Sequence, residues 1–174
     1  ETLAQWIDQL PEDALSQVPR LIWYRGRLYA EAAECAKALS WYDRAQRGFE
    51  AKQDAQAVAQ TLVDRGVSLR LLGRAHEAIE SCQEALARLA QAQGKEKQAL
   101  LTAAGAHRNL GIGLCQLGNV AEGTQELRQA LQLYREAGSS FGLALTHGDL
   151  GVALRLAGNL AASELHFEEA LRLW

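Results

Sequence analysis

The sequence lacks methionine altogether and contains only two prolines, Pro11 and Pro19. Because proline removes a backbone donor and breaks helices, the chain after Pro19 is free to be helical. Alanine and leucine dominate the composition, and both are strong helix formers. Since residue 1 is not methionine, we expect the chain to be a piece of a longer protein.

Cysteine is scarce, and its spacing argues against two kinds of site. Cys35, Cys82 and Cys115 are odd in number, lie far apart and include no CxxC pair. A disulfide framework or a zinc site requires a different arrangement. We expect the three thiols to be buried as small apolar groups in a reducing compartment.

Excess charge and long apolar runs are also missing. Hydrophobic residues make up 48% and charged residues 22%, which is typical of a soluble globular protein and not of a disordered one. A net charge of −3 argues against a surface that binds nucleic acid. The longest nearly uncharged apolar run, 99–106, is too short to span a bilayer, and no cleavable signal is present. These features predict a cytoplasmic protein that contacts neither nucleic acid nor membrane.

The sequence does contain a repeat. The segments 108–123 (RNLGIGLCQLGNVAEG) and 148–163 (GDLGVALRLAGNLAAS) align without a gap, and weaker copies lie at 24–38 and 64–78. Each copy has an anchor glycine, and the steps between these glycines are 40, 45 and 40 residues. The anchors are Gly26, Gly66, Gly111 and Gly151.

A second pattern follows each anchor glycine. A small residue comes first, then a larger apolar residue four positions later, and then an alanine after three more. The three sets are Ala38, Ala78, Gly123 and Ser163; Tyr42, Cys82, Leu127 and Phe167; and Ala45, Ala85, Ala130 and Ala170. Apolar positions three and four apart indicate amphipathic helices, so each copy is predicted to form two helices.

Glycine inside a helix is unfavourable by about 1 kcal/mol relative to alanine, so the anchors require a compensating contact. We expect each anchor glycine to face the small residue of the second helix, which brings the two backbones close together. The pairs Gly118-Asn119 and Gly158-Asn159 should end the first helices, because both residue types tolerate the left-handed conformation. In the first copy, Ala33 stands where the later copies have the turn glycine.

This pattern resembles the tetratricopeptide repeat over residues 19–174. Leu110-Gly111 and Leu150-Gly151 match its Leu-Gly pair, Tyr29 its tyrosine position, and Tyr42 and Phe167 its aromatic position. Two departures are the missing proline after the second helix and a period of 40 or more, where the common repeat has about 34 residues. The extra residues should lengthen both helices, as in sensor domains of large bacterial regulators and in kinesin light chains.

The resemblance implies an all-α, right-handed solenoid of about four helix-turn-helix repeats. The expected repeats are 19–58, 59–103, 104–143 and 144–174, preceded by an N-terminal packing helix and a proline-bounded connection at 1–18. The longer second step should be accommodated by longer helices around a turn at Gly94-Lys95.

The N-terminal segment suggests a more specific relationship. Leu3, Trp6, Ile7 and Leu10 would share one helical face that ends at Pro11. This segment, with Pro19 before the next apolar helix, resembles the opening of the helical sensor region in large ATP-binding LuxR-type regulators of the MalT group. The resemblance implies the sensor part of a bacterial transcription regulator; other helical-repeat regulators and scaffolds remain alternatives.

No catalytic constellation is present, so the chain is predicted not to be an enzyme and to hold no cofactor or metal. The Gly-Ile-Gly segment at 111–113 falls within a helix, without the strand that a phosphate-binding loop requires. His107 and His147 occupy equivalent positions on adjacent first helices, about 9 to 10 Å apart if the repeats stack in the usual way. This separation favours packing over a shared metal or a pH-sensing role.

The resemblance instead implies a binding groove lined by the first helices. The side chains expected to face it are Tyr24, Arg27, Asp64, Arg70, Arg108, Asn109, Gln116, Asp149 and Arg155. The expected ligand is a protein or peptide segment, or a small effector. The carboxylate of Asp64 would repel another carboxylate, so the carboxyl-terminal tail of a chaperone is not predicted.

Two alternative roles remain open. The chain could be a generic scaffold for complex assembly, or an accessory module of a multidomain enzyme whose catalysis lies elsewhere. A solenoid usually ends in a polar capping helix. Because none is evident here, we also expect further repeats in the parent protein or self-association through the C-terminal end.

Overall fold

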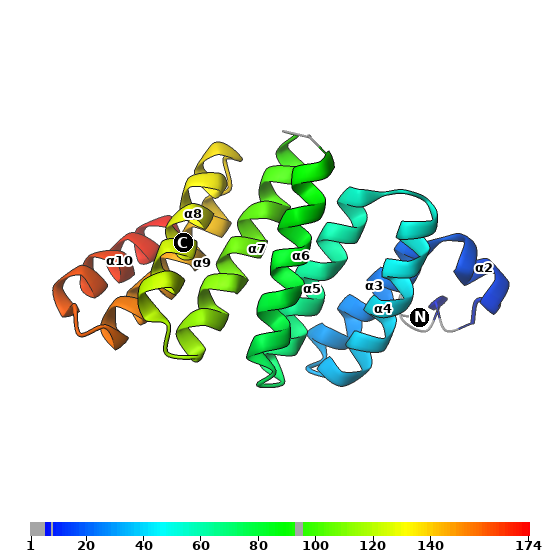
Figure 1. The fold of residues 1–174 in the computed structure, drawn as a ribbon, viewed down its shortest axis with the longest axis horizontal. Helices are drawn as coiled ribbons and strands as arrows, with labels where there is room; N and C mark the ends of the chain where they lie inside the picture. The colour runs from blue at the N-terminus through cyan, green and yellow to red at the C-terminus, as the bar shows by residue number, and fades with distance from the viewer. Residues whose placement is uncertain (1–5, 8, 93–95) are drawn as a thin grey trace.

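The computed structural model describes residues 6–7, 9–92 and 96–174, and within these ranges every regular element is a helix. The predicted all-α fold is confirmed. The helices labelled in Figure 1 are α2 (Glu12–Gln17), α3 (Pro19–Glu31), α4 (Cys35–Ala51), α5 (Ala55–Leu71), α6 (Ala75–Ala92), α7 (Lys97–Gln116), α8 (Val120–Glu136), α9 (Ser140–Leu156) and α10 (Leu160–Leu173).

From α3 onward the helices form a row of pairs that runs from one end of the molecule to the other (Figure 1). Each first helix (α3, α5, α7, α9) packs against the second helix that follows it (α4, α6, α8, α10), and each second helix packs against the next first helix. This neighbour-to-neighbour packing is that of a solenoid. The pairs span 19–51, 55–92, 97–136 and 140–173, so the expected repeats at 59, 104 and 144 begin four to seven residues inside α5, α7 and α9.

The first helices line one side of the row. Successive first helices contact one another, and in the described ranges these contacts are more extensive than any between successive second helices. A stack curves toward the side on which its helices approach more closely. The face lined by α3, α5, α7 and α9, here called the inner face, is therefore the concave one.

The anchor glycines allow the close approach that their spacing predicts, although not only to the expected residue. A Cβ atom on Gly111 would lie 2.7 Å from the backbone oxygen of Gly123, the expected small residue. At Gly151, the nearest atoms belong instead to the Phe167 ring, at 2.6 Å. The expected small residue Ser163 faces Gly151 as well, because its Oγ donates to the Gly151 carbonyl oxygen at 2.7 Å. The Phe167 ring lies beside it, in the space that a Cβ would need.

The turns between paired helices use one left-handed residue each. Gly73, Gly118 and Gly158 have φ values of 76°, 87° and 77°, and Ala33 adopts φ 60° at the same place in the first pair. The following asparagines behave differently from the prediction, because Asn159 has φ −89° and its side chain accepts a hydrogen bond from the Ala162 amide at 3.2 Å. The glycine ends one helix, and Asn159 caps the next.

Before the solenoid, the proline-bounded connection contains the short helix α2. Ile7 is fully buried and Leu10 packs against the same core, as expected, whereas Trp6 is 53% exposed. Pro19 occupies the first turn of α3, where its missing N–H has no intrahelical partner to lose. The expected position of Leu3 and the expected turn at Gly94-Lys95 lie outside the described residues.

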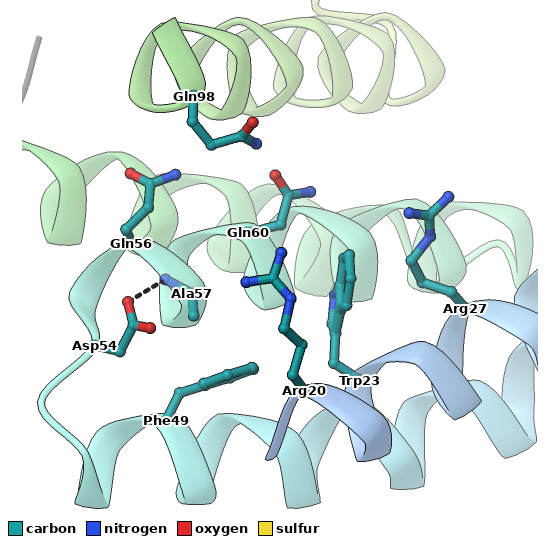
Figure 2. Close-up of a pocket in the computed structure, with 9 residues that line it drawn as sticks. All are labelled: Arg20, Trp23, Arg27, Phe49, Asp54, Gln56, Ala57, Gln60 and Gln98. Carbon is teal, nitrogen blue, oxygen red and sulfur yellow. Dashed lines mark hydrogen bonds between the residues drawn. The ribbon is translucent and has the colours of Figure 1, made fainter. Parts of the chain in front are cut away.

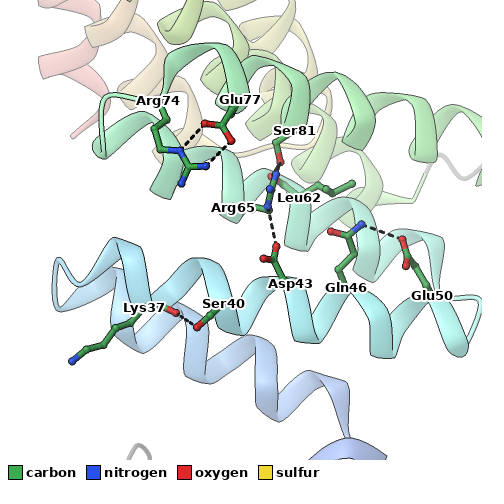
Figure 3. Close-up of polar contacts among 10 residues, drawn as sticks. All are labelled: Lys37, Ser40, Asp43, Gln46, Glu50, Leu62, Arg65, Arg74, Glu77 and Ser81. Atoms are coloured by element: carbon green, nitrogen blue, oxygen red, sulfur yellow. Dashed lines mark hydrogen bonds and ion pairs between the residues drawn. The ribbon is translucent and has the colours of Figure 1, made fainter.

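Polar contacts also join the first two helix pairs (Figure 3). Arg65 on α5 lies between α4 and α6: its Nε is 3.1 Å from Asp43 Oδ1, and its Nη1 is 3.4 Å from Ser81 Oγ. Ser81 in turn donates to the Leu62 carbonyl oxygen at 2.9 Å. This network links three consecutive helices, α4, α5 and α6.

The cysteines are free; Cys35 and Cys82 are buried as expected, and Cys115 is half-buried. None of the helices in the described part of the chain combines the length and apolarity needed to cross a bilayer.

Candidate functional site

A pocket of about 390 Å³ opens on the inner face near the ends at which α3, α5 and α7 begin. Its polar lining combines two guanidinium groups with three carboxamides, contributed by Arg20, Arg27, Gln56, Gln60 and Gln98 (Figure 2). Trp23 and Phe49 supply apolar surface and are themselves almost fully buried, at 9% and 6% exposure. We call this the N-terminal pocket.

A chain of polar contacts along α5 holds the carboxamides in place. Gln56 Nε2 donates to Thr102 Oγ1 at 2.9 Å, and the same hydroxyl lies 2.9 Å from Gln60 Oε1. Gln60 Nε2 then reaches Asp64 Oδ1 at 3.3 Å. The spacing of four residues puts Gln56, Gln60 and Asp64 on one face of the helix. The pocket wall is thus a connected network between α5 and α7.

Asp64 ends this chain beneath the pocket. Its Oδ2 accepts a hydrogen bond of 2.8 Å from the indole Nε1 of Trp23 on α3. Burial raises the pKa of Asp64 to about 6, although the hydrogen bonds from Trp23 and Gln60 act in the opposite direction. Asp64 is therefore a hydrogen-bonded carboxylate beneath the pocket and not an unpaired carboxylate that faces a ligand.

The charges of the pocket favour an anion. Arg20 and Arg27 extend on either side of Trp23 (Figure 2), and the Arg27 guanidinium lies 5.2 Å from the centre of the Trp23 ring. The carboxylate of Asp54 accepts a hydrogen bond from the Ala57 amide at 2.9 Å, as the N-cap of α5. Arg27 Nη2 also lies 3.4 Å from Glu31 Oε1 in an exposed ion pair. A bound carboxylate or similar planar anion would replace Glu31 as the partner of Arg27 and would also contact Arg20.

The nine predicted site residues are divided among several places. Arg27 lines the N-terminal pocket, and Asp64 lies beneath it. Tyr24 is 36% exposed beside Trp23, with ring centres 4.8 Å apart. Arg155 is exposed on α9 and lines neither this pocket nor the second one described below.

Three predicted residues form a charged row across α5, α7 and α9. Arg108 Nε lies 2.5 Å from Asp149 Oδ2. Burial and the nearby charge of Arg108 lower the pKa of Arg70, and Asp149 partly offsets this effect. The Nε of Arg70 is buried and has no hydrogen-bond partner among the described residues. The row has one carboxylate for two guanidinium groups.

Asn109 was expected to present its amide to the groove, but its side chain is buried. It is only 5% exposed, and its Nδ2 donates to the Gly105 carbonyl oxygen at 2.9 Å. A ligand could contact Asn109 only if the surrounding side chains moved.

A second, smaller pocket of about 210 Å³ lies between α7 and α9. The predicted residues Gln116 and Asp149 line it, together with apolar side chains that include Val152 and Leu156. Val152 and Leu156 are 42% and 62% exposed. The inner face is therefore cationic and polar near α3 and more apolar near α9.

Arg20, Gln56, Gln60 and Gln98 were not predicted as site residues. The predicted site residues were those that lie beside each anchor glycine, where the resembled repeats line their groove. These four residues lie instead near the beginnings of the helices. The spacing of Gln56, Gln60 and Asp64 was the available signal, since a polar row at every fourth position marks one face of a helix. Gln98 could not be placed opposite this row without knowing how α7 stacks on α5.

The histidines on first helices pair within their own repeats. His107 Nδ1 lies 2.6 Å from Glu126 Oε2 on α8, and His147 Nδ1 lies 2.9 Å from His166 Nδ1 on α10. Burial lowers the pKa of both His147 and His166, with further lowering of His147 by the charge of His166. Within the described ranges, no group of three or more His, Cys, Asp and Glu side chains could hold a metal ion.

Comparisons with known proteins agree with this architecture. Residues 101–174 match the tetratricopeptide repeat family model. No curated protein matches the chain in sequence.

The structural comparisons extend the similarity to nearly the whole chain. BtubC (BKLC) from P. vanneervenii superposes with a TM-score of 0.76 at 20% identity, covering 98% of this chain and 67% of that one. RapI in its apo form superposes with a TM-score of 0.78 at 15% identity, covering 97% of this chain and 59% of that one. MamA (41-end) from Desulfovibrio magneticus RS-1 superposes with a TM-score of 0.68 at 15% identity, covering 98% of this chain and 82% of that one.

Identities this low show similarity of fold alone, and the chain spans less than two thirds of RapI. The chain therefore has a tetratricopeptide-type solenoid fold, with the family's repeat recognised in residues 101–174.

Proposed function

We propose that the inner face is a non-catalytic recognition surface for a protein segment, and that the N-terminal pocket binds an acidic group of that segment. The observation that carries the proposal is the pair Arg20 and Arg27, which flank the buried Trp23 in a pocket that also contains three carboxamides and one carboxylate, the helix cap Asp54. The tetratricopeptide-type fold supports it, because such solenoids are interaction modules with extended concave surfaces.

The side chains match the chemistry of an extended peptide. Guanidinium groups form charge-assisted, often bidentate hydrogen bonds with carboxylates. The carboxamides of Gln56, Gln60 and Gln98 can both donate to and accept from a peptide backbone. Asp64 opposes an anionic ligand less than its formal charge suggests, since Trp23 and Gln60 already hydrogen-bond to it.

Peptide binding with defined charge tests this proposal. A short fluorescein-labelled peptide of Glu and Ser is compared with the same peptide carrying Gln in place of Glu, by fluorescence anisotropy. We expect the acidic peptide to bind more tightly, and Arg20→Gln and Arg27→Gln each to weaken it by about threefold to tenfold. Arg47→Gln, on the second helix α4, is the matched control. Equal binding of both peptides, or equal loss in the control, would contradict the proposal.

We further propose that the chain is the sensor region of a larger bacterial transcription regulator. The support is the resemblance of its N-terminal segment to LuxR-type regulators of the MalT group. The flanking sequence of the parent gene tests this: a nucleotide-binding loop upstream and a helix-turn-helix downstream are expected. If both are absent, the regulator role is wrong.

A generic scaffold or an accessory module of a multidomain enzyme remains an alternative. Charge reversal on the inner face, with Arg70→Glu and Arg155→Glu, distinguishes the scaffold from a sensor of a small effector. A scaffold predicts loss of protein capture with no change in any small-molecule response. A sensor predicts that the response to its effector changes as well.

We also propose self-association through α9 and α10. Leu165, Leu171 and Trp174 are 66%, 76% and 71% exposed, and the Trp174 ring packs edge-on against the exposed Phe141 at 5.5 Å. Exposed apolar side chains gathered at one end of a molecule are typical of interaction surfaces. We expect sedimentation velocity to show a dimer that Leu165→Glu and Leu171→Glu dissociate; a strict monomer at high concentration would contradict this.

A further inference from the structure

The last helix pair holds two histidines in direct contact. His147, in the middle of α9, and His166, in the middle of α10, have their Nδ1 atoms 2.9 Å apart and their ring centres 5.0 Å apart. Two imidazole nitrogens at this distance cannot both present lone pairs to each other. Either one ring is the neutral Nδ1–H tautomer and donates a hydrogen bond to the other, or a metal ion lies between the two nitrogens.

We propose that His147 and His166 form a two-imidazole chelate for a borderline transition-metal ion such as Ni²⁺, Cu²⁺ or Zn²⁺. Neutral imidazole is a preferred ligand of all three ions. Two nitrogens bonded to one ion at 2.0 to 2.1 Å are separated by about 2.9 Å across a right angle and about 3.4 Å across a tetrahedral angle. The observed separation lies at the lower end of this range, so small ring rotations would admit the ion.

Water must complete the coordination, because the described residues provide no third His, Cys, Asp or Glu ligand. Both histidines are only partly buried, so solvent can reach the pair. A site with two protein ligands and open positions binds reversibly. It therefore resembles an exchangeable site more than a closed structural one.

The ligand atoms of the pair select the kind of ion. The positive charges of Arg128, Arg135 and Arg172 oppose binding of any cation, so affinity must come from the two nitrogens. Glu169, which is paired with Arg172 at 2.5 Å, acts on His147 in the opposite direction. Hard cations such as Mg²⁺ and Ca²⁺ require several oxygen ligands, whereas this pair offers two nitrogens. Among these three ions, Cu²⁺ binds nitrogen ligands most strongly, and Ni²⁺ and Zn²⁺ bind them less strongly.

The preceding repeat supplies an internal comparison. His107 occupies the position equivalent to His147, but Glu126 stands where the last repeat has His166, and the two side chains lie 2.6 Å apart. The two pairs thus have the same places on a first and a second helix and differ in one ligand. Glu126→His would recreate the two-imidazole pair one repeat earlier.

Titration of untagged protein with Ni²⁺, followed by isothermal calorimetry, tests the site. We expect one Ni²⁺ per chain, loss of binding in His147→Gln and in His166→Gln, and no response to Mg²⁺. The variant Glu126→His should bind a second Ni²⁺. Far-UV circular dichroism confirms that each variant remains folded.

The opposite results would overturn the proposal. Absence of Ni²⁺ binding in the native protein, or undiminished binding in both folded glutamine variants, would show that the pair shares only a proton. A single Ni²⁺ in Glu126→His would show that these helix positions do not form a chelate. Because α9 and α10 would be joined by the ion, saturating Ni²⁺ should also raise the Tm of the native protein and not that of His166→Gln.

Discussion

The indole nitrogen of Trp23 donates a 2.8 Å hydrogen bond to the carboxylate of Asp64, 41 residues later in the chain. The bond joins α3 to α5 beneath the N-terminal pocket, and Gln60 extends it toward α7. Three consecutive first helices are therefore connected through polar atoms as well as through packing. Since a buried carboxylate lies at the centre of this network, the stability of the first repeats should depend on pH.

Asp64→Asn should remove part of that pH dependence. Burial raises the folded-state pKa of Asp64 to about 6, above its ordinary value of 3.8. The folded protein thus binds a proton between pH 4 and 6 that the unfolded chain has released, so stability falls as pH rises through this window. At pH 8 we expect the asparagine variant to be more stable by about 1 to 2 kcal/mol, and near pH 4 to match the native protein.

Urea unfolding at pH 4, 5, 6 and 8 measures this difference. Other carboxylates titrate in both proteins, so only the difference between the native protein and the variant reports on Asp64. A constant difference across the series would show that the native carboxylate is not destabilised by its burial. Asp54→Asn serves as a contrasting control, because this exposed side chain caps α5 by accepting a hydrogen bond from the Ala57 amide, which asparagine can also accept.

Replacement of two helical glycines by alanine should change the stability of the protein in opposite directions. A Cβ on Gly111 would lie 2.7 Å from a backbone oxygen, whereas a Cβ on Gly148 would have no atom within 4 Å. Gly111→Ala should therefore destabilise the protein by about 1 to 3 kcal/mol through overpacking. Gly148→Ala should stabilise it by up to about 1 kcal/mol through helix propensity. Thermal unfolding of the two variants measures both effects; the same sign for both would contradict the packing role of the anchor.

The fold was predictable because it depends on a pattern repeated along the chain. The alanines Ala45, Ala85 and Ala130 are fully buried, as their spacing indicates, and Gly118 and Gly158 end their helices in the left-handed conformation. Spacing identifies which positions face the neighbouring helix. It does not identify the contacting atom, which is why the Phe167 ring at Gly151 was missed.

The candidate site was predictable only in part, because it depends on side chains that do not repeat. Arg27 was found from its position beside an anchor glycine, whereas Arg20 and Gln98 lie at helix ends outside the repeated pattern. The pairing of His147 with His166 was also missed, since the prediction compared histidines on successive first helices. Contacts between a first helix and its own second helix depend on their rotation about each other, which the sequence does not specify.

The turn of the first repeat offers a test of backbone strain. Ala33 adopts φ 60°, whereas the equivalent Gly118 adopts φ 87° with no atom within 4 Å of a Cβ position. An alanine in this region is unfavourable by about 1 kcal/mol relative to glycine. Ala33→Gly should therefore stabilise the protein by about this amount, and Gly118→Ala should destabilise it equally. Chemical unfolding measures both; a destabilising Ala33→Gly would show that flexibility of the unfolded chain outweighs the relief of strain.

Asp149 should contribute more to stability than its ion-pair partner Arg108. The side chain of Arg108 is 21% exposed and that of Asp149 is 24% exposed, and the two lie 2.5 Å apart. Both charges also act on Arg70. Arg108→Gln leaves Asp149 with Arg70 nearby, whereas Asp149→Asn leaves two guanidinium groups to repel each other.

A double-mutant cycle in urea measures this asymmetry. We expect a coupling of about 1 kcal/mol between Arg108 and Asp149, smaller at high salt, where screening is stronger. Asp149→Asn alone should be the more destabilising single change, and adding Arg70→Gln should recover part of the loss because one of the two repelling charges is then gone. If Arg70→Gln instead makes the Asp149→Asn variant less stable, the packing of the Arg70 side chain between α5 and α7 outweighs the repulsion of its charge.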